Sequence, residues 1–435
     1  MSSSSTTWEY LPVLNECITI LLTIGIGVLM GHFQVLNVQT FLPQATKFIF
    51  YVALPLHILK GLGIGIDFYD DSFLWTFIAA FLILRVIALI FCFAMAFAAG
   101  GNNKMSIGDV AVMWLALSWI STIILGVPIA GAVFKDPMKG RTYGILAAIS
   151  SFIFQLPLQL FLFECHVLEK EYISGGNMNS NNNNTKDHHH DPEQPLVLPV
   201  EDNKVPLSDD EEEMEELELD CTPVPEEPEP VVTREPPVAA DEEPRNVSMA
   251  LWMQWACTWS IWKKIFYQLL RNPVLWGIIV GFFFSLTTIG PRFLSPMSSE
   301  YVPGLGWVFS TTTWLGECVS PVALVAMGVW MRAQGNKLIR IPLSSAILYM
   351  LCKLVMVPFL MVGLAKLVGL NDEAGRAAVL IAALPISMAS FSLANRYEIG
   401  EAVLSENVAL GTLLILPTII LWNLVLDALD IFPIA

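Results

Sequence analysis

The stretch LIAALPISMASFSLANRYEIGEAVLSENVALGTLLILPT, from Leu380 to Thr418, decides the fold. It contains two apolar runs separated by a short polar segment, and each run carries a proline, Pro385 or Pro417. A proline inside a helix removes a backbone hydrogen bond, so in lipid it is tolerated where neighbouring protein or a hydrated cavity satisfies the freed carbonyl groups. Pro385 therefore predicts an interrupted helix beside a binding cavity that the three following serines face. The alternative is a simple kink whose serines bond back to their own helix.

The composition places the chain in a lipid bilayer. Of its 435 residues, 54% are hydrophobic and 14% are charged, which soluble domains of this length do not show. The net charge of −17 arises mainly from the acidic segment Glu201–Glu243, so it describes a loop and not the apolar body. The seven cysteines lack paired or metal-binding spacing and are interpreted as small hydrophobic residues. No nucleic-acid partner, metal site or cofactor is implied.

Ten apolar runs are long enough to cross about 30 Å of hydrocarbon at 1.5 Å per residue. Five precede the acidic segment and five follow it. The expected spans are Leu11–Met30, Phe41–Leu62, Phe73–Ala98, Val110–Phe134, Ile145–Cys165, Leu269–Thr288, Trp307–Trp330, Ile341–Val368, Ala377–Leu393 and Val403–Leu426. The second of them is also compatible with two half-helices.

The polar segment between the two halves cannot build a core. It contains an asparagine run, three histidines, an acidic block and a tract rich in proline and glutamate. The histidines are interpreted as part of a solvated loop, whereas Ser208, which precedes five acidic residues, is a candidate substrate for a kinase. The predicted organisation is a first five-helix repeat (1–168), a disordered acidic hydrophilic loop (169–249), an interfacial tryptophan-rich helix (250–264) and a second five-helix repeat (265–435).

Four tryptophans between Trp252 and Trp262 recur at spacings of three, four and three residues, next to Lys263 and Lys264. This spacing places them on one face of a helix. Tryptophan favours the boundary between headgroups and acyl chains, and lysine favours anionic lipid, so the segment is expected to lie on the membrane surface. The alternative is an extension of the sixth span.

Landmarks in the two halves recur at nearly one offset, which indicates an internal repeat. The matched pairs are Pro55 with Pro321 at 266 residues, Arg85 with Lys353 at 268 residues, and Pro157 with Pro417 at 260 residues. Because five spans is an odd number, the second copy enters the membrane from the opposite side. The predicted fold is therefore an all-α polytopic membrane protein of ten transmembrane helices in two inverted repeats, whose sites characteristically lie between broken helices.

The same offset carries Pro385 to Ile120, where the chain has no proline. An interruption of the fourth span would there depend on Ser121 and Thr122. We therefore expect the fourth span to be less sharply unwound than the ninth.

Several motifs resemble the auxin efflux carriers of the PIN-FORMED type and the wider membrane transport family around them. The resemblance covers both halves of the chain. It rests on ALPISMASFSLANRYEIGEAVL in the ninth and tenth spans, RNPVLWGIIVG at Arg271–Gly281, TKFIFYVALPL at Thr46–Leu56, and STIILGVPI followed by FLFE at Phe161–Glu164. These motifs occur in the order and with the spacing of that family.

The resemblance implies a scaffold bundle and a transport bundle, with the fourth and ninth spans crossing where each is unwound. It further implies elevator-type, ATP-independent efflux of a small organic anion such as indole-3-acetate, a multi-pass location in the plasma membrane or endoplasmic reticulum, and a homodimer. Pro385 would be the crossing proline of the ninth span. Ser121 and Thr122 would match the Asn-Thr pair of the fourth span, and Glu317 an aspartate of the seventh.

The chain departs from the family pattern at the positions that would hold a carboxylate. Ile120 and Ser121 replace the crossing proline and asparagine of the fourth span, and Ile386 replaces the glutamine that follows the ninth-span proline. Phe81 stands where the third span of the family has an acid, four residues before the basic Arg85. Two amides are missing, which favours a more apolar ligand than auxin.

The residues that remain predict a substrate site and a group of charges. An anion that leaves water needs hydrogen-bond donors or a positive field, which half-helix N-termini supply. The candidate substrate-binding residues are Ser121, Thr122, Gln155, Pro385, Ile386 and Ser387. The candidates for coupling or charge compensation are Arg85, Glu317 and Lys353, since intramembrane charges indicate function or a buried partner. Arg85 is expected to pair with Glu164 or with the helix end, and Lys353 with Glu317. Alternatively both cations extend to an interface, and Gln155 holds helix to helix.

Three functions are compatible with these residues. The favoured one is a secondary carrier of a small organic anion. The second is a cation-coupled symporter or exchanger of the same architecture, which needs a carboxylate near the crossing, and the sequence offers Glu317 for it. The third is a sensor or scaffold that signals through the acidic loop. An enzyme is not expected, because no nucleophile, base and orienting acid share an evident site.

Overall fold

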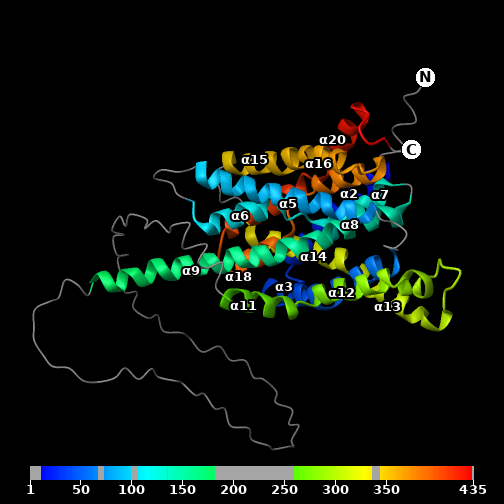
Figure 1. Ribbon diagram of the computed structural model, residues 1–435, viewed down its shortest axis with the longest axis horizontal. Helices are drawn as coiled ribbons and strands as arrows, with labels where there is room; N and C mark the ends of the chain where they lie inside the picture. The colour runs from blue at the N-terminus through cyan, green and yellow to red at the C-terminus, as the bar shows by residue number, and fades with distance from the viewer. Residues whose placement is uncertain are drawn as a thin grey trace, which may run out of the picture. The chain divides into compact units, whose positions relative to one another are not determined.

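The computed structural model describes residues 11–66, 73–98, 105–134, 136–181, 259–335 and 343–433. Trp252, Trp255, Ser208 and the histidine triplet lie outside these residues. The chain divides into two compact units, Met1–Glu171 with Ser248–Ala435 and Tyr172–Val247. The first unit contains the apolar helices and is described below (Figure 1).

The first half of the chain forms helices that follow the predicted apolar runs. Their bounds are α2 (Leu11–His32), α3 (Val38–Phe48), η1 (Ile49–Ala53), α4 (Leu54–Ile58), η2 (Leu59–Ile64), α5 (Phe73–Ala98), α6 (Ile107–Ser118), η3 (Thr122–Gly126), α7 (Val127–Val133), α8 (Pro137–Ser150), η4 (Ser151–Gln155) and α9 (Leu156–Asn181). The segments from α3 to η2 form one continuous helix, Val38–Ile64, so the second span is not two half-helices.

The second half repeats this pattern of long and interrupted helices. Its bounds are α11 (Trp259–Leu270), α12 (Pro273–Leu286), η5 (Gly290–Leu294), η6 (Pro303–Leu305), α13 (Gly306–Glu317), α14 (Val319–Gln334), α15 (Leu343–Leu351), η8 (Cys352–Met356), α16 (Val357–Val368), α17 (Asp372–Ala382), α18 (Met388–Arg396), α19 (Glu401–Leu413) and α20 (Ile415–Ala428). Helices α19 and α20 bend by 63° at Leu414, three residues before Pro417.

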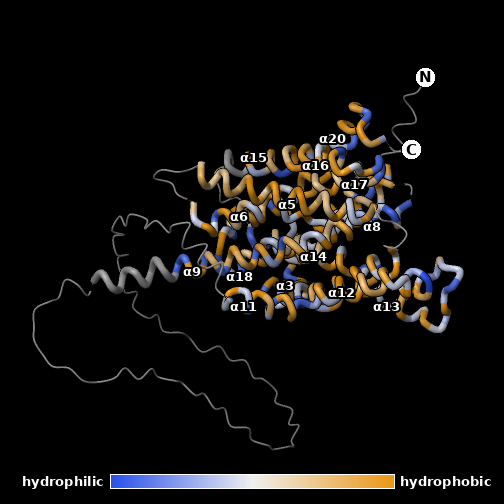
Figure 2. The backbone as a smooth tube through the Cα atoms, viewed as in Figure 1, coloured by the Kyte–Doolittle hydropathy of each residue, from blue (hydrophilic) through white to orange (hydrophobic). Residues whose placement is uncertain are grey.

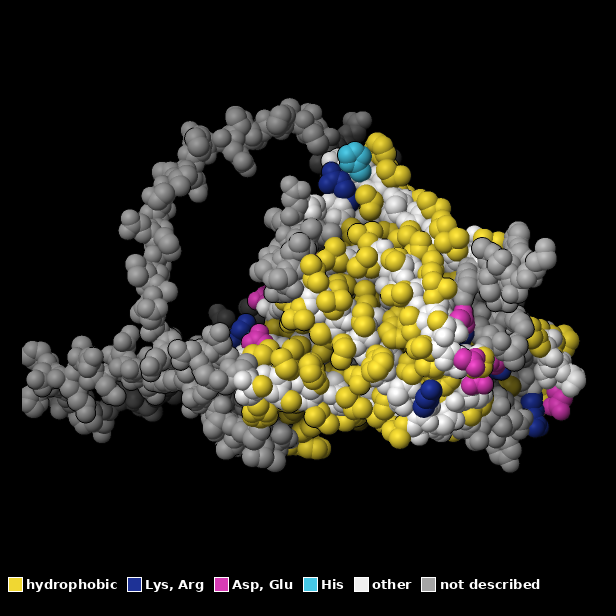
Figure 3. Space-filling model, turned by 90° about the horizontal axis from the view of Figure 1, so that it is seen from above, with side chains coloured by type: hydrophobic (Ala, Val, Ile, Leu, Met, Phe, Trp, Pro, Cys, Tyr) yellow, Lys and Arg dark blue, Asp and Glu magenta, His cyan; other side chains and the backbone are white. Residues whose placement is uncertain are grey.

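The surface of this unit is suited to lipid. Within the described residues, six helices are long and apolar enough to cross a membrane, and two bent pairs qualify if each is one span. The helices are apolar over most of their length (Figure 2), and one face is broadly hydrophobic with few charged side chains (Figure 3). Large side chains such as Leu22, Phe97, Phe359 and Leu367 are at least 60% exposed. The protein is therefore an all-α, multi-pass integral membrane protein.

Four prolines each follow a π-helical turn by two residues. The pairs are η1 with Pro55, η3 with Pro128, η4 with Pro157, and η8 with Pro358. A proline lacks the amide hydrogen and clashes with the carbonyl group four residues earlier, which favours a wider turn at that point. At Pro358 this carbonyl belongs to Leu354, and it accepts a 2.8 Å hydrogen bond from the indole of Trp422.

Close backbone packing sorts the helices into two groups. A Cβ atom added to Gly27 of α2 would lie 2.3 Å from the Val325 carbonyl oxygen of α14, and one added to Gly140 of α8 would lie 2.1 Å from the Ala130 carbonyl oxygen of α7. The Gly27 contact lies within one group of helices, which we call the α2–α14 group and which comprises α2, α3–η2, α12, α13 and α14. The Gly140 contact lies within the other group, which we call the crossing group and which comprises α5–α9 and α15–α20.

The glycine contact between the two groups involves a side chain, unlike the backbone contacts inside each group. Of the described glycines, Gly61 is the one whose added Cβ would meet the other group, and it would meet only the Ile145 side chain. At the described glycines, the close backbone-to-backbone contacts therefore lie within a group, and the one contact between the groups is made by a side chain.

Helix α11 lies at 67° to α12, with Trp259 78% and Trp262 38% exposed. Both the interfacial helix and the extension of the sixth span are compatible with this bend, so the interfacial helix stays a prediction. Helix α9 continues to Asn181, beyond residue 168, where we expected the first repeat to end.

Candidate crossing site

The fourth and ninth spans are both interrupted, and the interruptions cross. Ile120 and Ile386 form an isolated antiparallel bridge. The Ser121 amide donates to the Pro385 carbonyl at 3.0 Å, and the Ser387 amide donates to the Trp119 carbonyl at 3.2 Å. Each extended segment thus satisfies backbone groups that the other has lost from its helix. The predicted broken helices are confirmed, and 266 positions separate Ile120 from Ile386, as they separate Pro55 from Pro321.

The local sequence explains why the ninth span is interrupted. Residues that precede a proline avoid helical geometry, so α17 ends at Ala382, shortly before Leu384 and Pro385. Ser387 then restarts the chain as the N-cap of α18, because its hydroxyl accepts a hydrogen bond from the Ala389 amide.

The fourth span has no proline at its interruption. It has instead a β-branched run after Trp119, which is a weak helix former. Its gap of three residues, 119–121, is shorter than the gap of five residues, 383–387, in the ninth span. This agrees with the expectation that the fourth span is less unwound.

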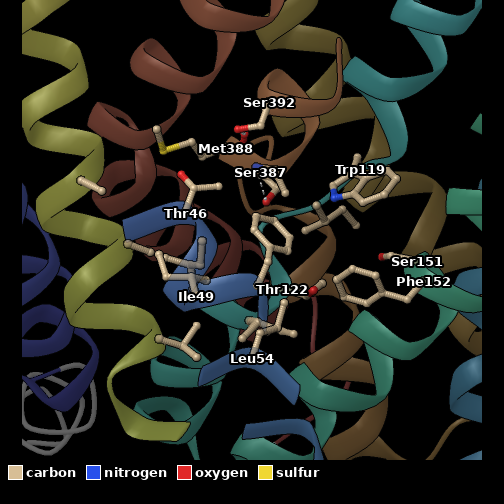
Figure 4. A pocket seen from close by; sticks show the side chains of 18 residues that line it. Thr46, Ile49, Leu54, Trp119, Thr122, Ser151, Phe152, Ser387, Met388 and Ser392 are labelled. Carbon is tan, nitrogen blue, oxygen red and sulfur yellow. Dashed lines mark hydrogen bonds between the residues drawn. The ribbon is translucent and has the colours of Figure 1, made fainter. Parts of the chain in front are cut away.

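A cavity of about 60 Å³ adjoins the crossing. Thr46, Ile49 and Leu54 of the α2–α14 group form one wall, and Trp119, Phe152 and other residues of the crossing group face them (Figure 4). None of the described residues that line this cavity is charged. Ligand pockets typically measure about 300–1,000 Å³, so an aromatic acid fits here only after the two walls separate.

The predicted substrate residues take two different places. Thr122 and Ser387 line the crossing cavity (Figure 4). Ser121, Pro385 and Ile386 form the backbone crossing and are not part of the lining. Their side chains therefore lie behind the residues that line the cavity.

The serines of α18 agree with both predictions, since Ser390 and Ser392 bond back to their own helix while Ser392 also lines the crossing cavity (Figure 4). Ser390 donates its hydroxyl to the Ser387 carbonyl at 2.5 Å, and Ser392 donates to the Met388 carbonyl at 3.2 Å. By contrast, the hydroxyl groups of Thr46 and Thr122 form no side-chain hydrogen bond within the described part of the chain. These two threonines are free to donate to a ligand.

Arg85 is completely buried behind the crossing cavity. Its guanidinium donates to Gln155 Oε1 at 2.9 Å and to the hydroxyl oxygens of Ser150 and Ser151 at 2.5 Å. Gln155 in turn donates to Ser118 at the end of α6. Gln155 thus joins helices and does not line the cavity, whereas Ser151 touches both Arg85 and the cavity.

Lys353, in η8, is the second buried cation. Its ammonium group donates to the Leu117 carbonyl of α6 at 3.1 Å, close to the helix C-terminus, where the partial charge is negative. It is near enough to Arg85 for the two charges to repel each other. The ion pairs formed within the described residues include neither cation.

The predicted ion pairs of these cations are wrong. Glu164 pairs with Lys264 of α11 at 2.6 Å and not with Arg85. It lies nine residues beyond Gln155, about 13 Å along the helix, which is out of reach of the Arg85 guanidinium. Glu317 pairs with Lys60 at 2.8 Å and not with Lys353, which is turned towards α6.

Most residues of the lining were not predicted as site residues. Among those with a polar group, Thr46 stands in the motif TKFIFYVALPL without a predicted role, and neither Trp119 nor Ser151 was predicted to reach a ligand. A usable pattern exists for Ser151, because it stands four residues before Gln155 and six before Pro157, in the turn that the proline widens.

Comparisons with known proteins identify the family and several similar sequences. A family model described as a membrane transport protein matches residues 12–423. A probable auxin efflux carrier component 5a of Oryza sativa subsp. japonica is 28% identical over 169 residues, and auxin efflux carrier component 8 of Arabidopsis thaliana is 27% identical over 175 residues. Each alignment covers 39% of this chain, and the chain spans 44% of the length of each relative.

Proposed function

Because the chain belongs to the membrane transport protein family, we propose that it is a secondary carrier that moves a small organic anion through the crossing site. The observation that carries this proposal is the pair of buried cations, Arg85 and Lys353, which hydrogen-bond to neutral groups. A buried charge without a counter-charge costs several kcal/mol even after relaxation. An anion in the crossing cavity supplies that counter-charge.

Ser151 transmits the positive field of Arg85 to the cavity. Its oxygen accepts a hydrogen bond from the guanidinium, so its own hydroxyl hydrogen is available to a ligand. Hydrogen-bond chains polarise one another in a low-dielectric interior. A carboxylate beside Ser151 would therefore receive a strengthened hydrogen bond without contacting Arg85.

The remaining lining favours an acid with an apolar body. Ile49, Leu54 and Phe152 contribute hydrocarbon, and Thr46 and Thr122 contribute hydroxyl donors. Two similar proteins are named auxin efflux carriers, which makes indole-3-acetate one acid to test. Because Ser121 and Ile386 replace the two amides of the family pattern, the site favours acids with fewer polar groups than indole-3-acetate.

The two helix groups support an elevator-type movement. Glycines allow close backbone contact within each group, whereas the one described glycine at the boundary, Gly61, meets the Ile145 side chain of the other group. The crossing group can then slide against the α2–α14 group without breaking its own packing. Such a displacement would open the 60 Å³ cavity, which has walls from both groups.

Uptake into proteoliposomes tests the proposal. Radiolabelled aromatic and aliphatic acids should show saturable flux, and the Pro385→Ala variant should lose about tenfold or more of it, because a continuous ninth helix removes the crossing. Pro417→Ala is the matched control, since this proline bends a neighbouring helix away from the cavity lining. Absence of flux for every acid, or equal flux in both variants, would contradict the proposal.

The same assay distinguishes the proposed anion carrier from the cation-coupled symporter or exchanger. Flux should persist without a sodium gradient and change little with pH, since Glu317 is engaged with Lys60 and not with the crossing. Strict dependence on sodium or on a proton gradient would favour the alternative.

A further inference from the structure

A second cavity, of about 480 Å³, lies between the two helix groups and is already large enough for a small ligand. The α2–α14 group contributes His57, Lys60 and Phe309, and the crossing group contributes Arg141 and Ile145. We call it the Arg141 cavity. Gly61 and Ile145, whose contact joins the groups, also line it.

The Arg141 cavity is displaced from the crossing cavity along the helix axes. On the fifth span, the crossing cavity uses Ser151, whereas this one uses Arg141, ten residues or about 15 Å away. On the second span, the corresponding residues are Ile49 and Lys60. Because the second and fifth spans run in opposite directions, both shifts point to the same side of the crossing.

The charges in the Arg141 cavity are only partly paired. Lys60 and Glu317 form an ion pair at 2.8 Å. Arg141 forms no hydrogen bond or ion pair with any side chain in the described part of the structure, and Glu16 is the second carboxylate of the lining. The cavity therefore offers one unengaged cation, opposed by one acid.

His57 adds a polar atom without a partner. Its Nδ1 lies 3.1 Å from the Gly316 carbonyl, so we assign the proton to Nδ1. The buried Nε2 then has no hydrogen-bond partner in the described residues. The imidazole lies within electrostatic range of Lys60, Arg141 and Glu317.

We propose that the Arg141 cavity is a second carboxylate site, in which Arg141 binds the acid and the apolar side chains of Ile145, Phe309 and Leu324 contact its body. This inference rests on the proposed transport of organic anions. Since Arg141 and Lys60 belong to different helix groups, sliding of the groups changes the site, and the acid binds here before loading or after release on one face. Glu16 weakens binding, which suits a site that must empty at each cycle.

Thiol labelling tests the site without measuring transport. In a background with the seven native cysteines replaced by alanine, Thr142→Cys places a thiol in the cavity. An anionic methanethiosulfonate should react with it faster than a cationic one, and millimolar benzoate or indole-3-acetate should slow the reaction about fivefold or more. Arg141→Gln should abolish both effects, Arg141→Lys should keep part of them, and Glu16→Gln should strengthen them.

Sided uptake provides the second measurement, in a wild-type cysteine background. Arg141→Gln should raise the KM for acid about tenfold from the face of this cavity and leave the KM from the other face unchanged. Protection that depends on Arg141 without any flux would support the site and overturn the proposed function. Flux with no protection, or protection that Arg141→Gln leaves intact, would overturn the site alone.

Discussion

At the scale of single residues, Arg85 shows how the site handles charge. The guanidinium donates five hydrogen bonds to neutral oxygens of Phe81, Ala147, Ser150, Ser151 and Gln155. Hydrogen bonds of a charged donor contribute about 1.5–3 kcal/mol each, which offsets part of the cost of burial. The cation thus remains in place when no ligand is present, and the cavity keeps its positive field.

Replacing Arg85 should distinguish the effect of its positive charge on uptake from the effect of its side-chain packing. We expect Arg85→Gln to lower organic-acid uptake about 10- to 100-fold, as the loss of one charge-assisted interaction of about 1.5–3 kcal/mol predicts. Uptake by the Arg85→Lys variant should fall between that of the wild type and that of Arg85→Gln, because lysine keeps the charge but not the planar, forked guanidinium. Initial rates in proteoliposomes measure the effect.

The control for this prediction is Ser150→Ala, which removes a partner of Arg85 that does not line the cavity. Ser151→Ala should lower uptake, whereas Ser150→Ala should change mainly thermal stability in detergent. Equal losses in the two serine variants would show that Arg85 acts through packing.

The sequence predicted which residues carry charge inside the membrane but not what they bind. A basic residue deep in an apolar run is visible in Arg85 and Lys353 without any structure. Apart from the Phe81 carbonyl, four positions before Arg85, their partners lie 62 to 236 positions away and depend on how the helices rotate against each other. Hydropathy contains no information on that rotation, so the pairings with Glu164 and Glu317 were wrong.

At the scale of helices, α11 is attached to the crossing group through Glu164 of α9. This buried carboxylate accepts from Lys264 of α11 at 2.6 Å and from the Tyr397 hydroxyl, just after α18, at 3.0 Å. Burial and the nearby Glu164 carboxylate raise the pKa of Tyr397 to about 12, so the phenol keeps its proton and donates. Trp262 stacks on Phe161 at 5.1 Å beside this pair.

Breaking this attachment should change the transport rate. Helix α11 leads into α12 of the α2–α14 group, so the Lys264–Glu164 pair connects the two groups. Half-exposed ion pairs contribute about 0.2–1 kcal/mol, and we expect Lys264→Gln to change the turnover rate about 1.5- to fivefold. The wild-type rate should also depend on ionic strength, whereas the variant rate should not.

Lys263→Gln is the matched control, because this neighbouring lysine is exposed and forms no ion pair in the described structure. An equal effect of the two lysine variants would show that the charge of α11, and not its attachment to Glu164, sets the rate.

The sequence located most helices but not their ends. Apolar runs indicated α2, α5 and α14 because lipid-facing helices must be apolar along their length. Helix α9 extends beyond its apolar run to Asn181, since backbone hydrogen bonds continue in a polar helix as well as in an apolar one. The interruption at Ile120 was found through the repeat and not through local sequence, which has no breaker there.

At the scale of the whole molecule, the proposed elevator-type transport requires the two helix groups to move. A disulfide between Gly61→Cys and Ile145→Cys would join them, because the Cβ added at Gly61 lies 3.2 Å from Ile145 Cγ1. We expect oxidation to stop uptake and a reductant to restore it. Uptake before and after copper phenanthroline measures this effect in a cysteine-free background.

A cross-link within one group is the control. Gly31→Cys and Arg332→Cys both belong to the α2–α14 group, where the added Cβ lies 3.4 Å from the Arg332 Cβ. This disulfide should leave uptake unchanged. Full activity of the oxidised Gly61–Ile145 variant would exclude sliding at this contact.

The two inverted five-helix repeats remain a prediction. The crossing residues Ile120 and Ile386 stand 266 positions apart, which is the offset of the sequence landmarks. The interrupted spans are too short to qualify as membrane helices by length, so the number of spans cannot be read from apolar length alone.

The turns before Pro55, Pro128, Pro157 and Pro358 have an evolutionary consequence. A π turn holds one extra residue, so losing it would rotate every later side chain of that helix by about 100°. Exchange of one proline would then present a different set of groups to the ligand while hydropathy and helix length stayed the same. Transporters of this architecture could diverge in cargo without any mutation among the residues that touch it.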